Sequence, residues 1–445
     1  MKTPVRKLIA TVCFFLCFCA IYKGLHYLLV NDVNSYTRLM MHQLYHTEKN
    51  IDVLFAGNSH VYLGVDPEVA DVSFGAYTFN AASSSQFMDG TLAVIKEALR
   101  ENDIKEIYVD VFYGVMSDED YSERENMFPT YYLSDFMKPS LNKADFLLHA
   151  SSKKHYTNSF FILHRYWETL LDIQSLLALH TSKSTDNYRQ YGPVSMQVLA
   201  EYKDRGFVTD KKVLEEEKII NPFAQEPIEL DAMLHASDYR NSLDEIVALC
   251  KSRQIELVLF VTPVPEWTII GKGNYDTYSE TFRSYAQENG IAFYDFNYCR
   301  NEYFDTNDRM MFRDYDHLNH AGALHFSFLF GDLVRGRVSE EAVFYSSLTE
   351  KMRDHEPRVY GLAGPEHTGD TDVSRVVSNR PGELAYRFSI IPEGADTETL
   401  LQDYSENDVF SVPHEQRGQL RIDWRSTADP QITGTLTGVY QYIEP

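Results

Sequence analysis

The feature that most constrains the fold is an alternation of short apolar runs with helical patterns. The apolar runs are rich in β-branched residues and occupy 51–56, 76–80, 104–112, 255–262 and 291–296. Helical patterns lie at 86–100, 242–253 and 275–289. Strands that are apolar throughout and alternate with helices are typical of a parallel sheet covered on both faces. The sequence therefore predicts an α/β fold.

One interval breaks this alternation, because roughly 130 residues separate the third apolar run from the helix before the fourth, and a structureless loop of that length is improbable in a compact domain. The interval holds helical patterns at 160–179 and 193–204 and an aromatic cluster at Tyr166-Trp167. We expect a helical insertion over about 113–240 that covers one edge of the sheet. It either shapes a substrate cleft or only packs against the sheet.

The composition changes after a further helical pattern at 339–353. From Glu356 onward the chain has no Lys, and Pro, Gly and Thr become common. Apolar and polar residues alternate in segments separated by turn signals, at 383–391, 409–412, 418–424 and 431–442. This pattern predicts a small antiparallel β domain of sandwich type over 356–445, after an α/β domain over 51–350.

The N-terminus begins with basic residues and continues into an apolar segment. Residues 8–22 carry no charge, and the apolar pattern resumes at 25–30, so the length approaches the roughly 20 residues that cross a bilayer. No small-residue cleavage site follows, which favours an uncleaved signal anchor over 1–30 against a cleaved signal peptide. The absence of Lys and Arg between Lys23 and Arg38 predicts a cytoplasmic N-terminus and an extracytoplasmic remainder. Residues 31–50 are expected to form a helical stalk.

Cysteine usage and charge narrow the class of protein. Only Cys250 and Cys299 lie outside the apolar segment, so the chain has no disulfide framework, although one bridge between them is possible. The formal net charge of −24 would repel a phosphate backbone and argues against nucleic acid as a partner. A content of 44% hydrophobic residues is that of an ordinary folded protein.

The sharpest local pattern is a small polar turn directly after the first apolar run, formed by Gly57, Asn58, Ser59 and His60. Open α/β sheets bind ligands at the carboxyl edge, where this turn lies. A helix starting there would direct backbone N–H groups at an oxyanion formed near Ser59. An ordinary turn accounts for the same residues equally well.

A second pattern lies shortly before an apolar helix at 323–333 and contains Asp314, Asp316, His317 and His320. A hydroxyl is a weak nucleophile until a neighbouring base takes its proton, and a His held by a carboxylate is the usual base. Asp314 and His317 are three residues apart and can supply both groups from one turn. Alternatively these four side chains could be metal ligands. In a third interpretation Asp316 instead caps the following helix. No supporting Cys or His spacing is present, so we expect no metal and no cofactor.

Together these two blocks resemble the SGNH (GDSL-like) hydrolase superfamily, in which a Gly-x-Ser block follows the first strand and an Asp-x-x-His block precedes the last helix. The resemblance spans roughly residues 51–335. With the N-terminal anchor, it is similar to the membrane-anchored branch that includes D-alanyl-lipoteichoic acid and alginate O-acetyltransferase-like proteins. It implies a flavodoxin-like three-layer domain in which Ser59 is the nucleophile, His317 the general base and Asp314 its orienting carboxylate.

The sequence departs from that family at the oxyanion hole. After the second apolar run the chain reads Phe79-Asn80-Ala81-Ala82-Ser83-Ser84-Ser85-Gln86, without the family's Gly block. The third run ends Asp110-Val111-Phe112, without the family's Asn. Candidates for oxyanion donors are therefore Asn58, Asn80 and Ser83, and candidates for substrate contacts are His60 and Gln86. His60 is equally well explained as a structural residue.

The expected activity is that of an extracytoplasmic, membrane-anchored serine esterase or O-acyltransferase. It would act on acyl esters, most simply acetyl esters, of cell-envelope glycans, with water or a sugar hydroxyl as acceptor. The transfer version implies a multi-spanning membrane O-acyltransferase as the partner that delivers the acyl group. A non-catalytic envelope protein that binds a glycan or a partner is the alternative, since the family's Gly-x-Asn block is missing.

Overall fold

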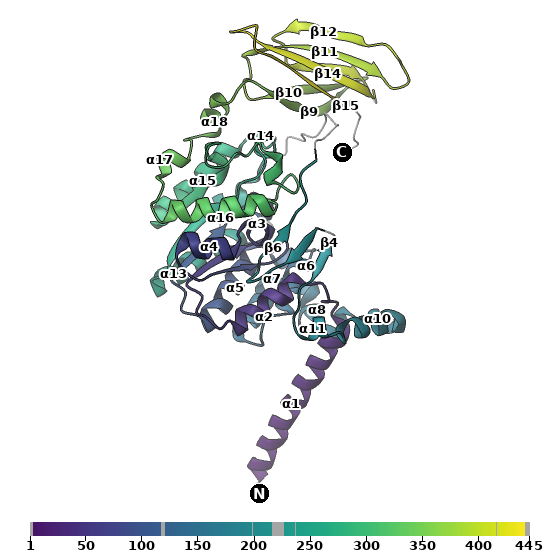
Figure 1. Ribbon diagram of the computed structural model, residues 1–445. Helices are drawn as coiled ribbons and strands as arrows, with labels where there is room; N and C mark the ends of the chain where they lie inside the picture. The colour runs from purple at the N-terminus through teal and green to yellow at the C-terminus, as the bar shows by residue number, and fades with distance from the viewer. Residues whose placement is uncertain are drawn as a thin grey trace. The chain divides into compact units, whose positions relative to one another are not determined.

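The structure is a computed structural model that describes residues 3–116, 121–197, 199–215, 227–235, 237–414 and 416–440 (Figure 1). The chain forms two compact units. The first unit comprises Met1–Lys211 and Asp231–Leu259, and the second comprises Lys212–Leu230 and Phe260–Pro445.

The central sheet has five strands in the order β2-β1-β3-β7-β8. Their bounds are β1 (Val53–Gly57), β2 (Thr78–Ala82), β3 (Glu106–Asp110), β7 (Glu256–Val261) and β8 (Ala292–Asp295). Strand β1 runs parallel to both of its neighbours, with Leu54 opposite Phe79 and Ile107. All residues of β1 and β2 are buried, as in a sheet covered on both faces. The predicted α/β class with a parallel sheet is confirmed.

The first unit also contains the helices that lie along the sheet. These are α2 (Tyr36–His46), α3 (Ser59–Gly64), α4 (Pro67–Phe74), α5 (Met88–Glu101) and α13 (Asp238–Arg253). Helix α13 packs on α5, and α2 contacts both α5 and β2. Leu39, Met40 and Leu44 of α2 are buried, so this segment packs inside the unit instead of standing free as a stalk. The apolar spacing that predicted its helix also supplies the face that it buries.

The segment between β3 and α13 is mostly helical, and its parts lie in the first unit up to Lys211. Its α-helices are α6 (Phe128–Ser134), α7 (Leu141–Ala150), α8 (Tyr156–Phe160), α9 (Ile162–Arg165), α10 (Ile173–Lys183), α11 (Asp186–Arg189) and α12 (Asp231–Leu234). The helix expected at 193–204 is wrong. Strands β4 (Ser195–Gln197), β5 (Ala200–Tyr202) and β6 (Val208–Asp210) form an antiparallel sheet there.

The turn between β5 and β6 explains this difference, because it docks on the edge strand β2. The Asn80 backbone N–H donates to the Arg205 carbonyl over 3.0 Å. Gly206 has φ +81°, and a Cβ atom there would lie 1.9 Å from the Asn80 carbonyl oxygen. Long-range pairing of this kind overrides local helical preference.

The second unit contributes the remaining helices of the α/β part. They are α14 (Glu266–Ile270), α15 (Tyr275–Asn289), α16 (His320–Val334), α17 (Glu340–Val343) and α18 (Leu348–Asp354). The single helix expected at 339–353 is thus two short helices. Each begins at a serine, Ser339 or Ser347, whose side chain caps the first turn.

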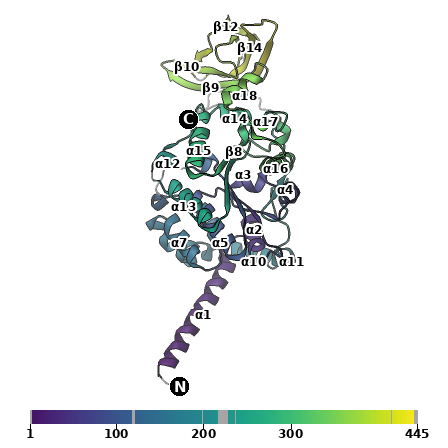
Figure 2. The same ribbon diagram turned by 90° about the vertical axis from the view of Figure 1, so that its left-hand side faces the viewer.

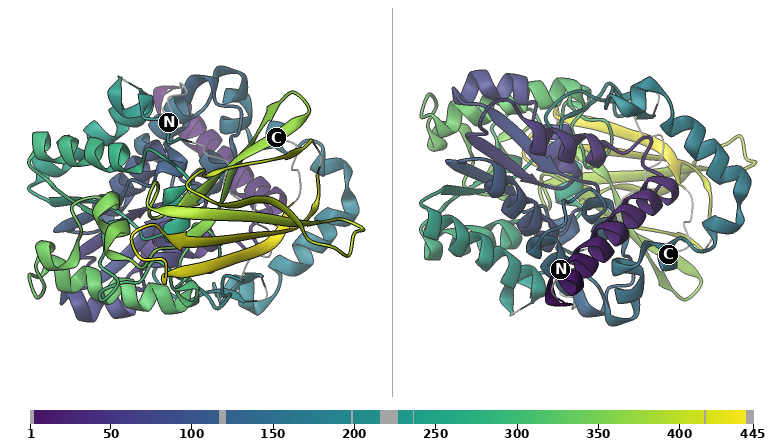
Figure 3. Two further views of the ribbon diagram at one scale, coloured as in Figure 1. Left: turned by 90° about the horizontal axis from the view of Figure 1, so that it is seen from above. Right: turned by 90° about the horizontal axis from the view of Figure 1, so that it is seen from below.

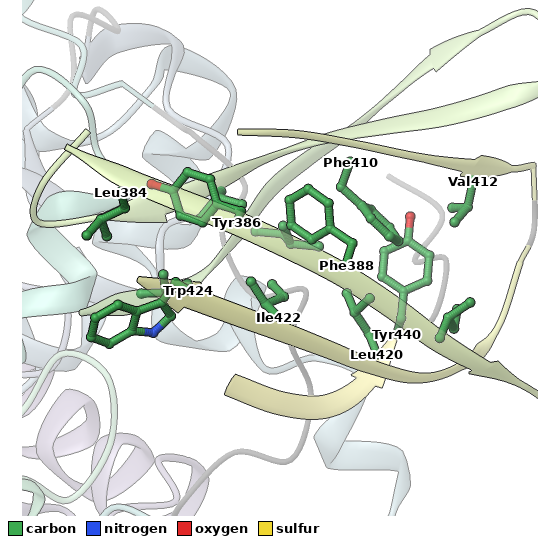
Figure 4. Close-up of a cluster of buried hydrophobic side chains, with 13 residues drawn as sticks. Leu384, Tyr386, Phe388, Phe410, Val412, Leu420, Ile422, Trp424 and Tyr440 are labelled. Carbon is green, nitrogen blue, oxygen red and sulfur yellow. The ribbon is translucent and has the colours of Figure 1, made fainter. Parts of the chain in front are cut away.

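The C-terminal part is a pair of antiparallel sheets, ordered β13-β10-β9 and β12-β11-β14-β15. Its strands are β9 (Val359–Thr368), β10 (Thr371–Ser378), β11 (Leu384–Pro392), β12 (Thr399–Ser405), β13 (Val409–Pro413), β14 (Gly418–Ser426) and β15 (Thr433–Tyr440). Figure 2 shows these strands in two layers, and the left view of Figure 3 shows them from above. Buried side chains from both sheets, including Phe388, Phe410 and Ile422, form their common core (Figure 4). The predicted β-rich C-terminal part is confirmed.

The N-terminal helix α1 (Thr3–Leu29) is the one described helix that is long and apolar enough to cross a membrane. Its segment Val5–Leu29 has a mean hydropathy of 2.1 and is exposed along most of its length (Figure 1). A signal sequence would have the same properties.

The cysteines outside α1 are not paired. Cys250 lies in the first unit and Cys299 in the second, and both are free and buried. Burial raises the pKa of the Cys250 thiol to about 12. Such a thiol stays protonated and unreactive at neutral pH.

Candidate functional site

Ser59 is the first residue of α3, one residue after the cap that starts this helix. Strand β1 ends at Gly57, and the Asn58 side-chain oxygen accepts a hydrogen bond from the His60 backbone N–H over 2.9 Å. A Cβ atom at Gly57 would lie 2.8 Å from Val61 and 3.0 Å from the Asp110 Cβ atom, so the close approach of β3 requires glycine. The turn thus fixes a serine at the carboxyl end of β1, between the edge strand β2 and β3 in the sheet.

Asp314 and His317 form a hydrogen-bonded pair in the second unit. His317 Nδ1 lies 2.9 Å from Asp314 Oδ1. The same oxygen accepts the backbone N–H groups of Asp316, over 3.0 Å, and of His317, over 2.9 Å. The carboxylate therefore fixes both the imidazole and the backbone of its turn.

The carboxyl group of Asp314 is held in its ionised form. Burial would raise the pKa of Asp314, but the hydrogen bond and charge of His317 outweigh it, with help from the Asp316 N–H group and Arg313, and they lower this pKa well below its usual range. The Arg313 Nε atom lies 3.1 Å from Asp314 Oδ2. An ionised carboxylate on Nδ1 is what a general-base histidine needs.

The loop that carries this pair is closed by hydrogen bonds on both sides. The Arg313 N–H donates to the His317 carbonyl over 3.0 Å, and Phe312 pairs with Leu318. Helix α16 starts at Asn319, whose side-chain oxygen accepts from the Gly322 N–H and whose amide donates to the Met310 and Phe312 carbonyls. The cap is thus Asn319 and not Asp316. Burial raises the pKa of Asp316, which is the opposite direction from Asp314.

The three candidate oxyanion donors differ in how their side chains are used. The Asn58 Nδ2 atom is buried and has no hydrogen-bond partner among the described residues. The Asn80 amide donates to the Val65 carbonyl over 2.6 Å. The Ser83 hydroxyl donates to Gln86 Oε1 over 2.9 Å. Of these three side chains, only Asn58 has a donor group that makes no hydrogen bond to a described residue.

The two candidate substrate contacts are both buried in the first unit. His60 packs against Phe112, with ring centroids 3.7 Å apart. Gln86 accepts from Ser83 and donates to Thr91 Oγ1 over 3.1 Å. The described contacts of both side chains are therefore internal to the protein.

The structure brings six of the predicted residues to one region. Strands β1 and β2 are parallel and Gly57 lies opposite Ala82, so the segments that follow them leave the same edge of the sheet. The Tyr62 hydroxyl on α3 lies 3.2 Å from the Ser84 hydroxyl on the second segment. The residues concerned are Asn58, Ser59, His60, Asn80, Ser83 and Gln86.

Sequence reasoning did not single out Asp110 as a functional residue. This buried aspartate ends β3, and its carboxylate lies beside Gly57. A carboxylate at the end of an otherwise apolar strand is a signal that the sequence does carry.

A hollow of about 600 Å³ lies elsewhere in the first unit. It is lined mainly by α5, α7 and α13, and its polar lining includes Asp89, Lys96, Asn142 and Glu245. None of the predicted site residues lines it.

Comparisons with known proteins do not identify a family. No family model matches the chain, and no curated protein matches it. Among solved structures, a Cellulomonas fimi endo-beta-1,4-mannanase double mutant matches at 11% identity over 93% of this chain and 99% of that chain. Its TM-score of 0.15 is too low to carry an argument about this protein.

Proposed function

We propose that the protein is a membrane-anchored serine esterase or O-acyltransferase of SGNH type. In this proposal Ser59 is the nucleophile, His317 the general base and Asp314 the carboxylate that orients it. The observation that carries the proposal is the Asp314–His317 pair, because a histidine oriented through Nδ1 by an ionised carboxylate is the arrangement that lets Nε2 act as a general base.

The chemistry follows from these groups. Ser59 Oγ attacks the ester carbonyl while His317 Nε2 takes its proton, which gives a tetrahedral intermediate. His317 then returns the proton to the departing alcohol, and an acyl-serine remains. Water or a sugar hydroxyl attacks the acyl group and loses its proton to His317, which then returns this proton to Ser59 Oγ as the acyl–oxygen bond to the serine breaks.

The oxyanion of the intermediate needs preorganised donors. The buried Asn58 amide beside Ser59 is the best side-chain candidate, because no described residue accepts from it. Removing one such donor typically lowers kcat by about 10²–10³.

The substrate class follows from the resemblance and the N-terminal segment. We propose an acyl ester, most simply acetyl, on a cell-envelope glycan, with α1 as a signal anchor and the rest of the chain extracytoplasmic. In the transfer version a multi-spanning membrane O-acyltransferase supplies the acyl group. The net charge of −24 favours a neutral glycan over an anionic polymer.

The test uses the full-length protein purified in detergent, treated with a fluorophosphonate probe and with p-nitrophenyl acetate. We expect covalent labelling and hydrolysis by the wild type and by Ser252→Ala, a change at an exposed serine of α13. Ser59→Ala is expected to lose both signals. Equal labelling of wild type and Ser59→Ala would reject the nucleophile.

A second candidate is a non-catalytic protein that binds an envelope glycan or a partner. The internal hydrogen bonds of Asn80 and Gln86 favour it, because they occupy two groups that an enzyme of this type would direct at its substrate. It predicts glycan binding without any hydrolysis or labelling, and with equal binding by Ser59→Ala.

A further inference from the structure

Three side chains that bind metals in proteins lie together in the three-stranded sheet of the C-terminal part. His367 is on β9, Asp372 is on β10, and His414 directly follows β13. Their ligand atoms all lie within 4.8 Å of one another. The proposed active site uses none of them.

The sheet itself brings these residues together. Asp372 lies directly opposite His367 in the β9–β10 pair and opposite Val412 in the β10–β13 pair. The His414 backbone N–H continues this second pairing, because it donates to the Asp370 carbonyl over 2.9 Å. The site is therefore built on three adjacent strands, which hold ligands more rigidly than loops do.

The electrostatics favour a cation. Asp372 is fully buried, whereas both imidazoles are half-exposed. Its Oδ1 atom lies 2.7 Å from His367 Nδ1 and 2.8 Å from His414 Nδ1. Burying a carboxylate is costly unless a positive charge compensates it, and a cation held by the two imidazoles and this carboxylate would supply that charge.

We propose that His367, Asp372 and His414 bind a zinc ion. Imidazole nitrogens and a carboxylate oxygen are ligands that zinc accepts, and three protein ligands leave a fourth position for water or an exogenous ligand. The bound ion would link the β9–β10 hairpin to the end of β13. A hydrogen-bonded cluster without metal is the outcome that competes with this proposal.

The experiment measures zinc bound by the full-length protein after dialysis against a chelator, zinc addition and gel filtration. We expect the wild type to retain one zinc more per chain than His367→Gln or His414→Gln. Glutamine keeps an N–H group that can donate to Asp372, so these variants preserve the hydrogen bond but remove the ligand. The matched control, His235→Gln, changes an exposed histidine at the end of α12 and is expected to retain zinc like the wild type.

A second readout separates a lost ligand from a lost fold. Zinc should raise the Tm of the wild type and of His235→Gln, but not that of His367→Gln or His414→Gln, while all four melt cooperatively without zinc. Equal zinc content and equal Tm shifts in all four proteins would overturn the proposal.

An independent observation concerns a set of exposed apolar side chains in the first unit. Phe161, Trp167, Leu170, Leu171, Ile173 and Leu177 are 41% to 75% exposed. Helix α10 carries no Asp, Glu, Lys or Arg from Ile173 to Ser182. An exposed apolar patch of this kind marks a contact surface for another molecule or a membrane.

This apolar surface is fixed beside the C-terminal end of α1. Lys183, at the end of α10, is buried; its ammonium donates to the Tyr27 carbonyl over 2.7 Å and pairs with Asp32 at 2.8 Å. The Tyr188 hydroxyl also donates to Asp32. Figures 1 and 2 both show α10 next to this end of α1.

We infer that this apolar patch, from Phe161 to Leu177, lies in the interfacial layer of the membrane that α1 enters. This inference rests on the proposed anchoring by α1. It favours lipid over a protein partner for three reasons: α9 and α10 contact α1, α10 has no Asp, Glu, Lys or Arg from Ile173 to Ser182, and the patch includes a tryptophan, which prefers the headgroup region.

The experiment places the full-length protein in phosphatidylcholine vesicles and uses Trp167 as a depth reporter. Trp267→Phe and Trp424→Phe leave Trp167 as the only tryptophan. We expect its emission to be blue-shifted, quenched by lipids brominated near the headgroup end of the acyl chain, and protected from aqueous iodide.

Two matched variants complete the experiment, each carrying one tryptophan in a background with Trp167→Phe. Leu16→Trp reports insertion of α1 and should be quenched by bromines deep in the bilayer. Val72 is 75% exposed on α4, which lies away from α1 in Figures 1 and 2, so Val72→Trp should be quenched by iodide alone. If Leu16→Trp is inserted while Trp167 behaves like Val72→Trp, the inference is wrong and a protein partner becomes the better occupant. If the tryptophan of Leu16→Trp is not inserted, α1 does not anchor the protein, and the proposed anchoring on which this inference rests is wrong.

Discussion

At the residue scale, the chemistry depends on Asp314 remaining ionised beside His317. One oxygen of Asp314 accepts from the imidazole and from two backbone N–H groups, so the carboxylate both selects the histidine tautomer and shapes the loop. An amide of the same size would keep part of the loop geometry but would present the wrong group to Nδ1. The two roles can therefore be separated by substitution.

Asp314→Asn is expected to lower kcat for p-nitrophenyl acetate by about 10⁴-fold. The reason is that the amide no longer stabilises the imidazolium formed when His317 takes the Ser59 proton. Hydrolysis rates and Tm are measured together. Asp316→Asn serves as the control in the same turn and should lower kcat far less. Equal losses of kcat in both variants would count against the role assigned to Asp314.

Asn58 has two separable functions, since its oxygen caps α3 and its nitrogen has no described acceptor. Asn58→Asp keeps the cap oxygen but removes the N–H donor, whereas Asn58→Ala removes both. We expect both variants to lose about 10²–10³ in kcat. Asn58→Ala alone should also lose about 1 kcal/mol of stability from the missing cap.

Chemical denaturation and steady-state kinetics of the two variants decide between these functions. Full activity of Asn58→Asp would mean that Asn58 only caps the helix and that the oxyanion is stabilised elsewhere.

The sequence predicted contacts between neighbouring residues of the candidate sites but not contacts between distant ones. Asp314 and His317 could be paired from the sequence because they share one turn, so their contact is local. Asp372 and His414 could not, because 42 residues separate them and only the pairing of β10 with β13 makes them neighbours. Side-chain partners such as Val65 for Asn80 were equally beyond reach, since they depend on tertiary packing.

At the scale of elements, buried strands were predictable and short peripheral elements were not. Each of the five apolar runs became a strand of the central sheet. For β1 and β2 the cause is burial of every residue, since burial on both faces demands apolar residues throughout. The helix expected at 193–204 is wrong because β5 pairs with β4 on one side and with β6 on the other, and the turn between β5 and β6 meets Asn80. The periodicity of so short a segment says little about such contacts.

That turn gives a prediction about stability. Gly206→Ala should destabilise the protein by more than the roughly 1–3 kcal/mol that a left-handed backbone alone costs, because its Cβ atom would also meet the Asn80 carbonyl. Gly75→Ala is the matched control, with φ +67° and open space around the added carbon. Urea unfolding of both variants measures the difference, and equal destabilisation would mean that the turn moves away from β2 at little cost.

At the scale of the whole molecule, the β-rich part of the second unit is joined to its helical part through one buried carboxylate. Glu266 on α14 accepts from the Tyr360 hydroxyl on β9 and from the Asn307 amide. His355 lies 3.3 Å away and Lys351 of α18 lies 3.9 Å away. Nearby, Trp267 and Ile270 of α14 pack on Ala363 and Val377. A sequence contains no local sign of such a junction, because its members come from five separate segments.

This junction predicts how the stability of the second unit depends on pH. Burial would raise the pKa of Glu266, but the neighbouring His355, the charge of Lys351 and the hydrogen bond from the Tyr360 hydroxyl lower it to about 2 from an ordinary 4.5. A depressed carboxyl pKa contributes stability that is fully present above pH 4.5 and is lost as the pH falls toward 2. The contribution is roughly 3 kcal/mol.

Urea unfolding followed by Trp424 fluorescence between pH 6 and pH 2.5 measures this effect, with Glu266→Gln as the comparison. Glutamine cannot ionise, so the difference in unfolding free energy between wild type and variant should shrink as the pH falls below 4.5. The control is Glu356→Gln, which removes an exposed carboxylate next to His355. Its unfolding free energy should depend on pH in the same way as that of the wild type. A difference between wild type and Glu266→Gln that stays constant over this range would show that Glu266 does not hold its charge at the junction, and would place the acid sensitivity of the second unit elsewhere.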